Sequence, residues 1–540
     1  MSFKEKVIYQ IYPKSFLDTN QDGVGDLPGI KQKMPYLKQL GVDMVWLSPI
    51  YSSPQKDNGY DVADYTAINP TFGTMEDFDN LMAAANEQGI EIMLDMVFNH
   101  VSTEYEWFQK ALAGEKKYQD YFILRDEPTD WVSKFGGNAW APFGETGRYY
   151  LHLFDKTQAD LNWRNPEVRE ELFKVLRFWM AKGVKGFRFD VINLIGKDEV
   201  LKDCAENDGK PAYTDRPITH EFLQMMNQAT FGQDTEMITV GEMSFTTVKE
   251  CILYTKPDRE ELNMTFNFHH LKVDYKDGKK WTQMPFDFAK LKELFHTWGT
   301  QMSEESGWNA LFWNNHDQPR ALNRFIDVDN YRVAGAKMLA SAIHLSRGTP
   351  YIYMGEEIGM LDPDYDSMEQ YVDVESLNAY QELLDAGKTE KAAFEIVKAK
   401  SRDNSRTPMQ WDNERYSGFS QVAPWLTIGR SAAEINVAKE LQEGSIFKYY
   451  QQLIKLRKQY PVISDGSYEA FLPEHPQIYG YVRRLAEHSL LVINNFFAEE
   501  TTIELPEEFL AGDVLIGNYA VENITREFTL KPYQTMAIYY

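Results

Sequence analysis

Short apolar runs alternate with longer amphipathic stretches along the first part of the chain. The runs at residues 7–13, 42–48 and 90–100 have the length and the β-branched and aromatic content of buried strands. The stretches at residues 29–41 and 75–89 place apolar residues every three or four positions, which predicts helices. Strands that alternate with helices in this way predict a parallel sheet with helical crossovers.

The alternation stops after His100. Residues 101–161 are rich in aromatic residues, Gly and Pro and have no helical periodicity, so we expect an inserted subdomain there. Helical periodicity returns at residues 165–183, where Asn165 can cap a helix and Pro166 fits its first position. The apolar face of this helix is expected to consist of Val168, Leu172, Val175, Leu176 and Trp179.

Further strand-like runs follow at residues 184–191, 236–242, 262–268, 310–315 and 349–354. With the first three runs they make eight, and eight parallel strands interleaved with helices indicate a TIM barrel, whose active site lies at the carboxyl ends of the strands. Residues 446–461 fit its last helix, and short strands with turns follow. The predicted fold class is α/β: a (β/α)8 barrel of residues 1–100 and 162–461, an inserted subdomain B at 101–161, and a C-terminal β-sandwich at 462–540.

Composition narrows the classes of partner. The 540 residues include 12 Trp, 31 Tyr and 32 Phe and are 43% apolar, which is typical of a large globular protein. A net charge of -25 repels nucleic acid and anionic membrane surfaces, so we expect neither as a partner. Cys204 and Cys251 cannot form a disulfide framework. Since the chain shows no signal-peptide pattern and no long apolar run, we expect a cytoplasmic protein. Nothing in the sequence indicates a protein partner or an organic cofactor.

Polar residues gather at the ends of the predicted strands. They are Asp95, Asn99 and His100 after the third strand, Arg188 and Asp190 at the fourth, Glu242 at the fifth, and His316 and Asp317 at the seventh. A single acid at a strand end is most simply a helix cap or part of a surface ion pair. Several acids converging on one rim provide what glycoside hydrolysis requires, namely a carboxylate nucleophile, a carboxylic acid that protonates the leaving oxygen, and groups that bind hydroxyls.

The motifs "DMVFNH", "QADLNW", "GFRFDVINL", "VGEM" and "FWNNHDQPR", in this order, resemble those of the alpha-amylase superfamily, glycoside hydrolase family 13, in its oligo-1,6-glucosidase branch. The resemblance extends from "VIYQIYPKSF" to the end of the chain. It implies a retaining mechanism with Asp190 as nucleophile, Glu242 as general acid/base and Asp317 as transition-state stabiliser. Arg188, two residues before the nucleophile, is expected to keep Asp190 ionised by charge pairing.

The same resemblance implies a set of substrate-binding residues: Asp57, Tyr60, His100, Arg188, His316 and Arg402. The two histidines would bind hydroxyls of the glucosyl ring and Tyr60 would stack on it. Asp57 and Arg402 would close the pocket at the non-reducing end, which implies removal of one terminal glucose. Val191, directly after the nucleophile, resembles the pattern of enzymes that act on α-1,6 or α,α-1,1 bonds.

Residues 18–27, "DTNQDGVGDL", space their oxygen side chains like an EF-hand loop, with Gly23 at the sharp turn. An ion sensor is disfavoured because Gly29 stands where an EF-hand has its bidentate Glu, and no paired second loop follows. In this branch of the family the resemblance implies one structural Ca²⁺ or Mg²⁺ ion. The implied ligands are Asp18, Asn20, Asp22, the carbonyl of Val24, and Asp26. A bare Asp/Gly turn without a metal is the alternative.

The segment of residues 266–281 is cationic in an acidic protein. Its four lysines against Asp274 and Asp277 give a local charge of +2, which can reverse the sign of the field over about 8–10 Å. A solvated loop is the simpler interpretation. However, the segment resembles that of family members that hydrolyse trehalose 6-phosphate, which predicts this sugar phosphate as the substrate and glucose and glucose 6-phosphate as products. The candidate phosphate contacts are His270, Lys272, Lys276, Lys279 and Lys280.

Three alternatives stay open. An oligo-1,6-glucosidase or dextran glucosidase would keep the mechanism and act on isomalto-oligosaccharides. A glucosyl isomerase is less favoured because the region near residue 325 holds only Arg320 and Arg324 rather than an arginine-rich loop. A non-catalytic amylase-like binding or transporter-associated domain is disfavoured because all three catalytic carboxylates are present.

Overall fold

The computed structural model describes residues 1–204 and 206–540. The chain forms two compact units: residues 46–87 and 91–267 make one, and residues 1–45, 88–90 and 268–540 make the other. This division does not follow the predicted domain boundaries near residues 101, 161 and 462, which stay predictions. Each unit is described by itself below.

The barrel strands predicted from the sequence are all present and belong to one eight-stranded sheet, in the order β13-β12-β11-β5-β2-β1-β15-β14. Their bounds are β1 Ile8–Ile11, β2 Met44–Leu47, β5 Glu91–Met96, β11 Gly186–Phe189, β12 Ile238–Glu242, β13 Met264–Phe266, β14 Ala310–Leu311 and β15 Thr349–Tyr353. The predicted (β/α)8 fold class is therefore confirmed.

In the unit of residues 46–87 and 91–267, strands β5, β11, β12 and β13 pair in parallel. The register sets Arg188 on β11 beside Asp95 on β5 and Val240 on β12. These strands are buried along nearly their whole length, as expected where both faces of a parallel sheet are covered. The helices of this unit include α3 (Met75–Gln88), α6 (Pro166–Ala181), α7 (Pro217–Ala229) and α8 (Val248–Thr255).

Helix α6 begins and packs as its sequence predicts. The side chain of Asn165 accepts a hydrogen bond from the backbone N–H of Glu167, and Pro166 occupies the first turn. The buried residues of the helix include the whole predicted face. Trp179 also donates from its indole Nε1 to the carbonyl of Tyr65 at 2.9 Å, which fixes α6 against the neighbouring segment.

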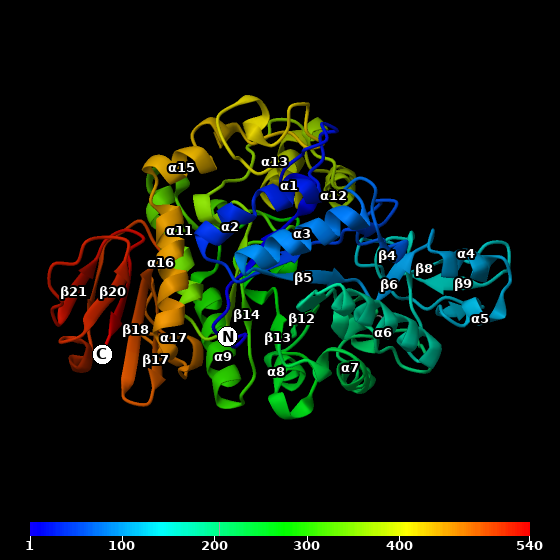
Figure 1. Cartoon of the computed structure of the whole chain (residues 1–540), viewed down its shortest axis with the longest axis horizontal. Helices are drawn as coiled ribbons and strands as arrows, with labels where there is room; N and C mark the ends of the chain where they lie inside the picture. Colours follow the sequence, from blue (N-terminus) through cyan, green and yellow to red (C-terminus); the bar gives the residue numbers. More distant parts are fainter. Residues whose placement is uncertain (205) are drawn as a thin grey trace. The chain divides into compact units, whose positions relative to one another are not determined.

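The region after β5 contains short antiparallel pairs in place of barrel elements (Figure 1). Strand β6 (His100–Ser102) pairs with β10 (Gln158–Asp160), and a second sheet has the order β7-β9-β8. The bounds here are β7 Leu124–Arg125, β8 Trp140–Pro142, β9 Tyr149–Leu151, α4 Glu106–Leu112 and α5 Lys116–Gln119. Trp131, Trp140 and Leu151 belong to its apolar core, so the aromatic residues of this stretch serve packing.

In the other unit, β1, β15 and β14 pair in parallel. The stretch at residues 29–41, expected as one helix, is two: α1 (Leu27–Gln32) and α2 (Met34–Leu40). The break has a simple cause, because Pro35 has no N–H with which to continue the helical hydrogen bonds. Helices α12 (Val374–Asp385) and α13 (Glu390–Lys400) were not predicted. The remaining long helices are α9 (Phe288–Glu304), α11 (Val328–His344) and α16 (Ile446–Gln459).

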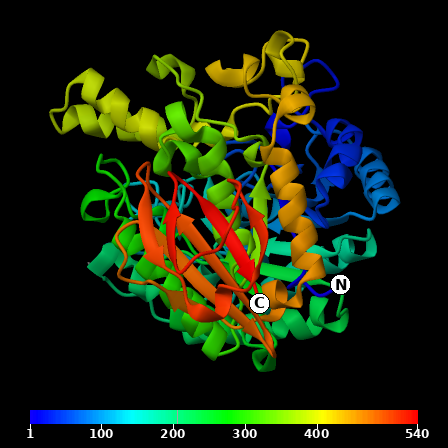
Figure 2. The same cartoon turned by 90° about the vertical axis from the view of Figure 1, so that its left-hand side faces the viewer.

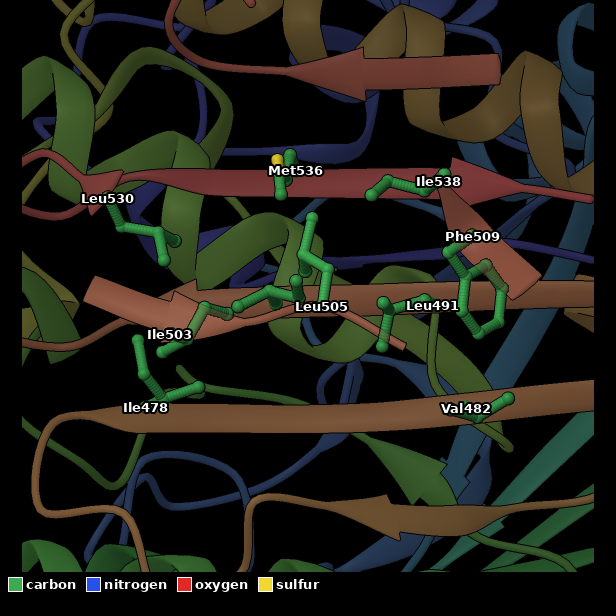
Figure 3. Packing of buried hydrophobic residues seen from close by; sticks show 10 residues of the cluster. Ile478, Val482, Leu491, Ile503, Leu505, Phe509, Leu530, Met536 and Ile538 are labelled. Atoms are coloured by element: carbon green, nitrogen blue, oxygen red, sulfur yellow. The ribbon is translucent and has the colours of Figure 1, made fainter. Parts of the chain in front are cut away.

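The C-terminal region begins with α17 (Pro461–Asp465) and continues as a five-stranded antiparallel sheet of order β16-β17-β18-β22-β20 (Figure 2). A separate pair, β19 with β21, lies over an apolar cluster that includes Ile478, Leu491, Ile503 and Leu530 (Figure 3). The strands are β16 Glu469–Phe471, β17 Ile478–Leu485, β18 His488–Asn495, β19 Thr501–Glu504, β20 Asp513–Gly517, β21 Glu527–Leu530 and β22 Thr535–Tyr539.

Among residues 1–204 and 206–540, no helix combines the length and the apolar character that crossing a membrane requires.

Candidate active site

One guanidinium connects three carboxylates at the ends of neighbouring strands. Arg188 Nη1 donates to Asp95 Oδ1 at 2.8 Å and to Asp190 Oδ1 at 2.6 Å, and its Nη2 donates to Glu242 Oε2. Arg188 and Asp95 are fully buried, whereas the side chains of Asp190 and Glu242 keep 10% and 8% exposure. Because Arg188 is held by these carboxylates, its position favours organising them over binding a sugar hydroxyl. We call this set the Arg188 cluster.

The protonation of the Arg188 cluster differs from the simple expectation. Burial raises the pKa of Asp190 well above its ordinary value, and Arg188 opposes this without cancelling it, since Glu242 and Asp95 raise it further. Burial likewise raises the pKa of Asp95 to about 6, although the charge of Arg188 acts to lower it. Burial therefore opposes the expected role of Arg188 in keeping Asp190 ionised by charge pairing. Three carboxylates around one cation would carry two uncompensated negative charges if all were ionised, and a retaining glycosidase needs a proton on its acid.

Val191, directly after Asp190, has an unusual backbone conformation. Its φ of 37° lies in the left-handed region, which a β-branched residue rarely adopts and which costs about 1–3 kcal/mol. The side chain is buried in the apolar core of the inserted region, and the backbone N–H lies 3.3 Å from Glu242 Oε2. The fold thus holds a strained backbone directly after Asp190.

The predicted sugar-binding residues of this unit form a continuous hydrogen-bonded group. Tyr60 donates from its hydroxyl to Asp95 Oδ2 at 3.0 Å, and its ring lies 5.8 Å from the Arg188 guanidinium. His100 Nε2 is 3.1 Å from the carbonyl of Tyr60. Gln158 donates to Asp57 Oδ2 at 3.0 Å and lies 3.3 Å from His100 Nε2. The structure therefore brings Asp57, Tyr60 and His100 together through Gln158.

His100 is neutral, and its ring is oriented by Asn99, which is itself held by the buried Lys197–Asp160 ion pair. Burial lowers its pKa to about 4. Its Nδ1 is 3.2 Å from Asn99 Nδ2, and Lys197 Nζ lies 2.6 Å from Asn99 Oδ1 and 2.7 Å from Asp160 Oδ2. Since Asn99 presents its amide to His100, Nδ1 must accept and Nε2 carries the proton. The sequence analysis did not identify Lys197 or Asp160 as parts of the site, although Asp160 lies in the motif "QADLNW".

Asp317 lies in the other unit, after β14, and is held by two arginines. Arg406 Nη2 donates to Asp317 Oδ1 at 2.7 Å, and Arg402 Nη1 lies 3.5 Å from the same oxygen. Arg402 also donates from Nη2 to Asp373 Oδ1 at 2.6 Å. Burial would raise the pKa of Asp373, but Arg402 and Arg406 outweigh it and leave that pKa lower than usual. This arrangement fixes the carboxylate of Asp317.

His316 lies beside this group, with Nδ1 2.9 Å from Gln10 Nε2 and Nε2 3.3 Å from Asp317 Oδ2. Its ring stacks on Tyr12 at 5.8 Å. Arg406 donates to the carbonyl of His316 at 2.7 Å, so the same arginine positions both His316 and Asp317. The sequence analysis chose Arg402 from "SRDNSRTPMQW" and missed Arg406, because two arginines in one motif give no sign of which faces the carboxylate.

His270, a candidate phosphate contact, lies in an apolar setting, and its role toward phosphate stays a prediction. It is fully buried among the rings of Phe295, Phe312 and Trp313, and Nε2 donates to the carbonyl of Phe312 at 2.8 Å. Burial lowers its pKa to about 4, so it carries no charge at neutral pH. This hydrogen bond anchors the lysine-bearing segment to the residues directly after β14.

The four lysines of the segment have different environments. Lys272, Lys276 and Lys279 are exposed. Lys280 is half-buried, with its Nζ 2.7 Å from Glu375 Oε2, and the same oxygen lies 3.3 Å from Arg402 Nε. Lys280 is thereby tied to the residue expected to close the sugar pocket. Nearby, Asp274 is bound by Arg324 and Lys400 at 2.8 Å each, so this carboxylate does not oppose an incoming anion.

The predicted ion loop is closed by its own hydrogen bonds. Asp18 accepts from the N–H groups of Gln21 and Gly23 at 2.8 and 2.9 Å and from the Ser420 hydroxyl at 2.6 Å. Asp26 caps α1 through Gly29 at 2.7 Å. Gly23 has a φ of 85°, and a Cβ there would meet the carbonyl of Ala423 at 2.4 Å. In the part of the chain that the structure describes, His, Cys, Asp and Glu form no group of three placed to hold a metal. Oxygen donors of this kind nevertheless suit a hard cation.

A (β/α)8 barrel with buried acids at its strand ends is an arrangement that suits a glycoside hydrolase. The family model "Alpha amylase, catalytic domain" matches residues 10–466, and "Alpha-amylase SusG C-terminal domain" matches residues 478–537. The chain belongs to the alpha-amylase family and is a glycoside hydrolase of family 13.

Several known proteins are similar to this chain along almost its whole length. A trehalose-6-phosphate hydrolase from Bacillus subtilis (strain 168) is 49% identical over 546 residues, which covers 99% of this chain and 97% of that protein. An oligo-1,6-glucosidase from Bacillus cereus is 45% identical and covers 99% of this chain and 98% of that protein. The crystal structure of Bacillus licheniformis trehalose-6-phosphate hydrolase superimposes with a TM-score of 0.96 at 49% identity, covering 99% of both chains.

Proposed function

We propose that this enzyme hydrolyses trehalose 6-phosphate to glucose and glucose 6-phosphate. The observation that carries the proposal is the cationic segment of residues 266–281, whose Lys280 is joined through Glu375 to Arg402. Similarity along almost the whole chain to proteins named trehalose-6-phosphate hydrolase supports the same substrate. The substrate is then a small sugar phosphate.

The proposed mechanism follows the retaining pathway. Asp190 attacks the anomeric carbon of the unphosphorylated glucosyl unit as the bond to the bridging oxygen breaks, and Glu242 gives its proton to that oxygen. Glucose 6-phosphate leaves, and a glucosyl ester on Asp190 remains. Glu242 then takes a proton from water, which attacks the same carbon, frees glucose and restores both carboxyl groups. Asp317, fixed by Arg406, is assigned the stabilisation of the positive charge that develops on the sugar.

The lysines supply the proposed recognition of phosphate. Ammonium groups bind phosphate monoesters. Lys272, Lys276 and Lys279 are exposed to solvent, where an incoming phosphate can reach them. Lys280 is the one that the fold holds in place, through Glu375 at 2.7 Å. A phosphorylated disaccharide does not cross a membrane unaided, so we propose a cytoplasmic location.

The deciding experiment measures kcat/KM on trehalose 6-phosphate, trehalose and isomaltose, with glucose and glucose 6-phosphate quantified separately. We expect a preference for the phosphorylated sugar of about 100-fold, which equals about 2.7 kcal/mol of transition-state binding. Equal or better activity on isomaltose would reject the phosphate proposal in favour of an oligo-1,6-glucosidase, the activity named for the Bacillus cereus relative.

We also propose one structural Ca²⁺ or Mg²⁺ ion at Asp18, Asn20, Asp22, the carbonyl of Val24, and Asp26. Asn20 and Asp22 are exposed, and Asp18 is buried. The ion would join the loop's carboxylates and have no part in the chemistry. Chelation should lower Tm, and added Ca²⁺ should restore it, whereas the D22A variant should show neither change. An unchanged Tm on chelation, with no metal found by elemental analysis, would mean a bare turn.

A further inference from the structure

A cavity of about 510 Å³ lies in the unit of residues 46–87 and 91–267, and none of its lining residues belongs to the Arg188 cluster. Three segments line it, around residues 119–125, 161–164 and 195–201, together with Arg148. This volume falls within the usual range for small-molecule sites. Neither the proposed reaction nor the predicted substrate residues use it.

Arginine side chains give this cavity its donors. Arg125 Nη1 donates to the carbonyl of Leu201 at 2.7 Å, and Arg164 Nε donates to the carbonyl of Lys197 at 3.1 Å. These bonds hold the two guanidinium groups in place. Within residues 1–204 and 206–540, the remaining N–H groups of these two side chains have no protein acceptor. Arg148 is held more weakly, 3.6 Å from Asp126.

The acidic residues of the lining are mostly neutralised. Asp120 forms an ion pair with Lys116, and Asp198 lies 3.0 Å from Arg216 Nε. Glu199 is exposed. Lys197 also lines the cavity, but its ammonium is engaged by Asn99 and Asp160, which leaves the arginines as the available cations. A local excess of guanidinium groups is notable in a chain of net charge -25.

The other part of the lining is apolar. Ile123, Leu124 and Leu201 are half-buried and keep apolar surface open there, while the lining residues Phe122, Leu161, Trp163 and Ile195 are almost completely buried. Guanidinium groups bind phosphate with paired hydrogen bonds, and an apolar floor suits the carbon skeleton of a small organic group. We propose that this cavity is a second ligand site, which binds a small phosphate monoester of the size of a sugar phosphate. This proposal does not depend on the substrate proposed above.

The test is equilibrium dialysis of the full-length enzyme with radiolabelled glucose 6-phosphate. The R125A/R164A variant should lose one bound ligand per chain, or bind it about tenfold more weakly, because two charge-assisted hydrogen-bonding groups are removed. The matched control is R177A on α6, whose guanidinium pairs with Glu170 outside the cavity and which should bind as wild type does. Inorganic phosphate should compete for the site, and glucose should not.

Wild-type binding of glucose 6-phosphate by the folded double variant would overturn the proposal, as would equal competition by glucose. Folding is checked by activity on an aryl α-glucoside, which the double variant should retain. If it does not fold, the single R148Q and R125Q variants take its place, and unchanged binding in both would again overturn the site. Hydrolysis of trehalose 6-phosphate by the double variant is measured as well. Failure of the second ligand site can then be distinguished from failure of the proposed function.

Discussion

At the scale of single residues, one guanidinium group serves three buried carboxylates. Arg188 supplies one positive charge to Asp95, Asp190 and Glu242, so full ionisation of all three would leave the Arg188 cluster with two uncompensated negative charges. Keeping a proton is therefore favourable, and the retaining mechanism requires it on Glu242 while Asp190 is charged. Removing Arg188 would leave buried carboxylates unpaired, at a cost of about 3–5 kcal/mol.

The separate roles proposed for Asp190 and Glu242 predict that their variants lose activity differently on substrates with good and poor leaving groups. Asp190→Asn should lower kcat by about 10³-fold or more on every substrate, since no ester can form. Glu242→Gln should lose as much on a disaccharide but far less on an aryl glucoside, because an acidic phenol leaves without protonation. Steady-state kinetics on both substrates measures this. Equal losses of the two variants on the aryl glucoside would contradict the assigned roles.

Asp95 predicts a shift in the pH profile. Its pKa is raised to about 6 by burial, and it raises that of Asp190 in turn. Asp95→Asn removes one negative charge, so the remaining carboxyl groups should lose their protons at lower pH. Both limbs of the kcat/KM profile should then move to lower pH, by about one unit. Asp373→Asn, in the other unit, is the comparison, and a profile for D95N that matches wild type would show that Asp95 is protonated throughout.

The residues that sequence reasoning identified are those whose position follows from strand order. Asp190 and Glu242 stand directly at the ends of β11 and β12, so the apolar runs placed them at a strand end, and the resemblance of the motifs around them implied their roles. The burial of His270 could not be predicted, because it depends on Phe295, Phe312 and Trp313, which come from other elements. The left-handed φ of Val191 was equally invisible, because valine gives no sign of such a conformation.

At the scale of elements, strand β17 carries adjacent arginines with opposite roles. Arg483 is fully buried and donates to four backbone carbonyls, those of Ser467, Leu345, Ile463 and Gly466, at 2.7 to 2.9 Å. It thereby joins the C-terminal sheet to the ends of α11 and α17. Arg484 points to solvent and pairs with Glu508 and Glu469.

These environments predict very different costs of substitution. Arg483→Leu leaves buried carbonyls without donors and should lower the free energy of unfolding by about 3 kcal/mol or more. Arg484→Leu removes only exposed ion pairs and should cost less than about 1 kcal/mol. Denaturant unfolding of both variants measures the difference, with kcat at low temperature as the check that the fold survives. Similar values for the two would contradict the anchoring role of Arg483.

The helices and strands differ in how well the sequence predicts them. The barrel strands and α6 were predicted because burial imposes a clear pattern and because Asn165 and Pro166 mark a helix start. The division of α1 from α2 could have been read from Pro35. Helices α12 and α13 were missed, and with them Asp373 and Glu375, since the residues between the last barrel strand and α16 have no fixed place in an alternating pattern.

At the scale of the whole molecule, charge sets a problem that the lysine-bearing segment solves locally. A net charge of -25 repels a phosphorylated substrate at long range, while the lysines of residues 266–281, if they bind phosphate as proposed, attract it at short range. The two effects respond differently to salt. The screening length falls from about 30 Å at 0.01 M to about 10 Å at 0.1 M, so long-range repulsion is screened first and close contacts persist.

Kinetics at varied ionic strength should therefore show a distinctive trend. The ratio of kcat/KM for trehalose 6-phosphate to that for a neutral aryl glucoside should rise about twofold between 0.01 and 0.1 M salt, because repulsion is removed while the lysine contacts stay. Replacing exposed Lys276 and Lys279 with Gln should lower the ratio at low salt and steepen its rise. The neutral substrate alone should be insensitive. A ratio that falls from the lowest salt onward would mean that attraction by the lysines governs the approach, and that the net charge of the chain is too distant to matter.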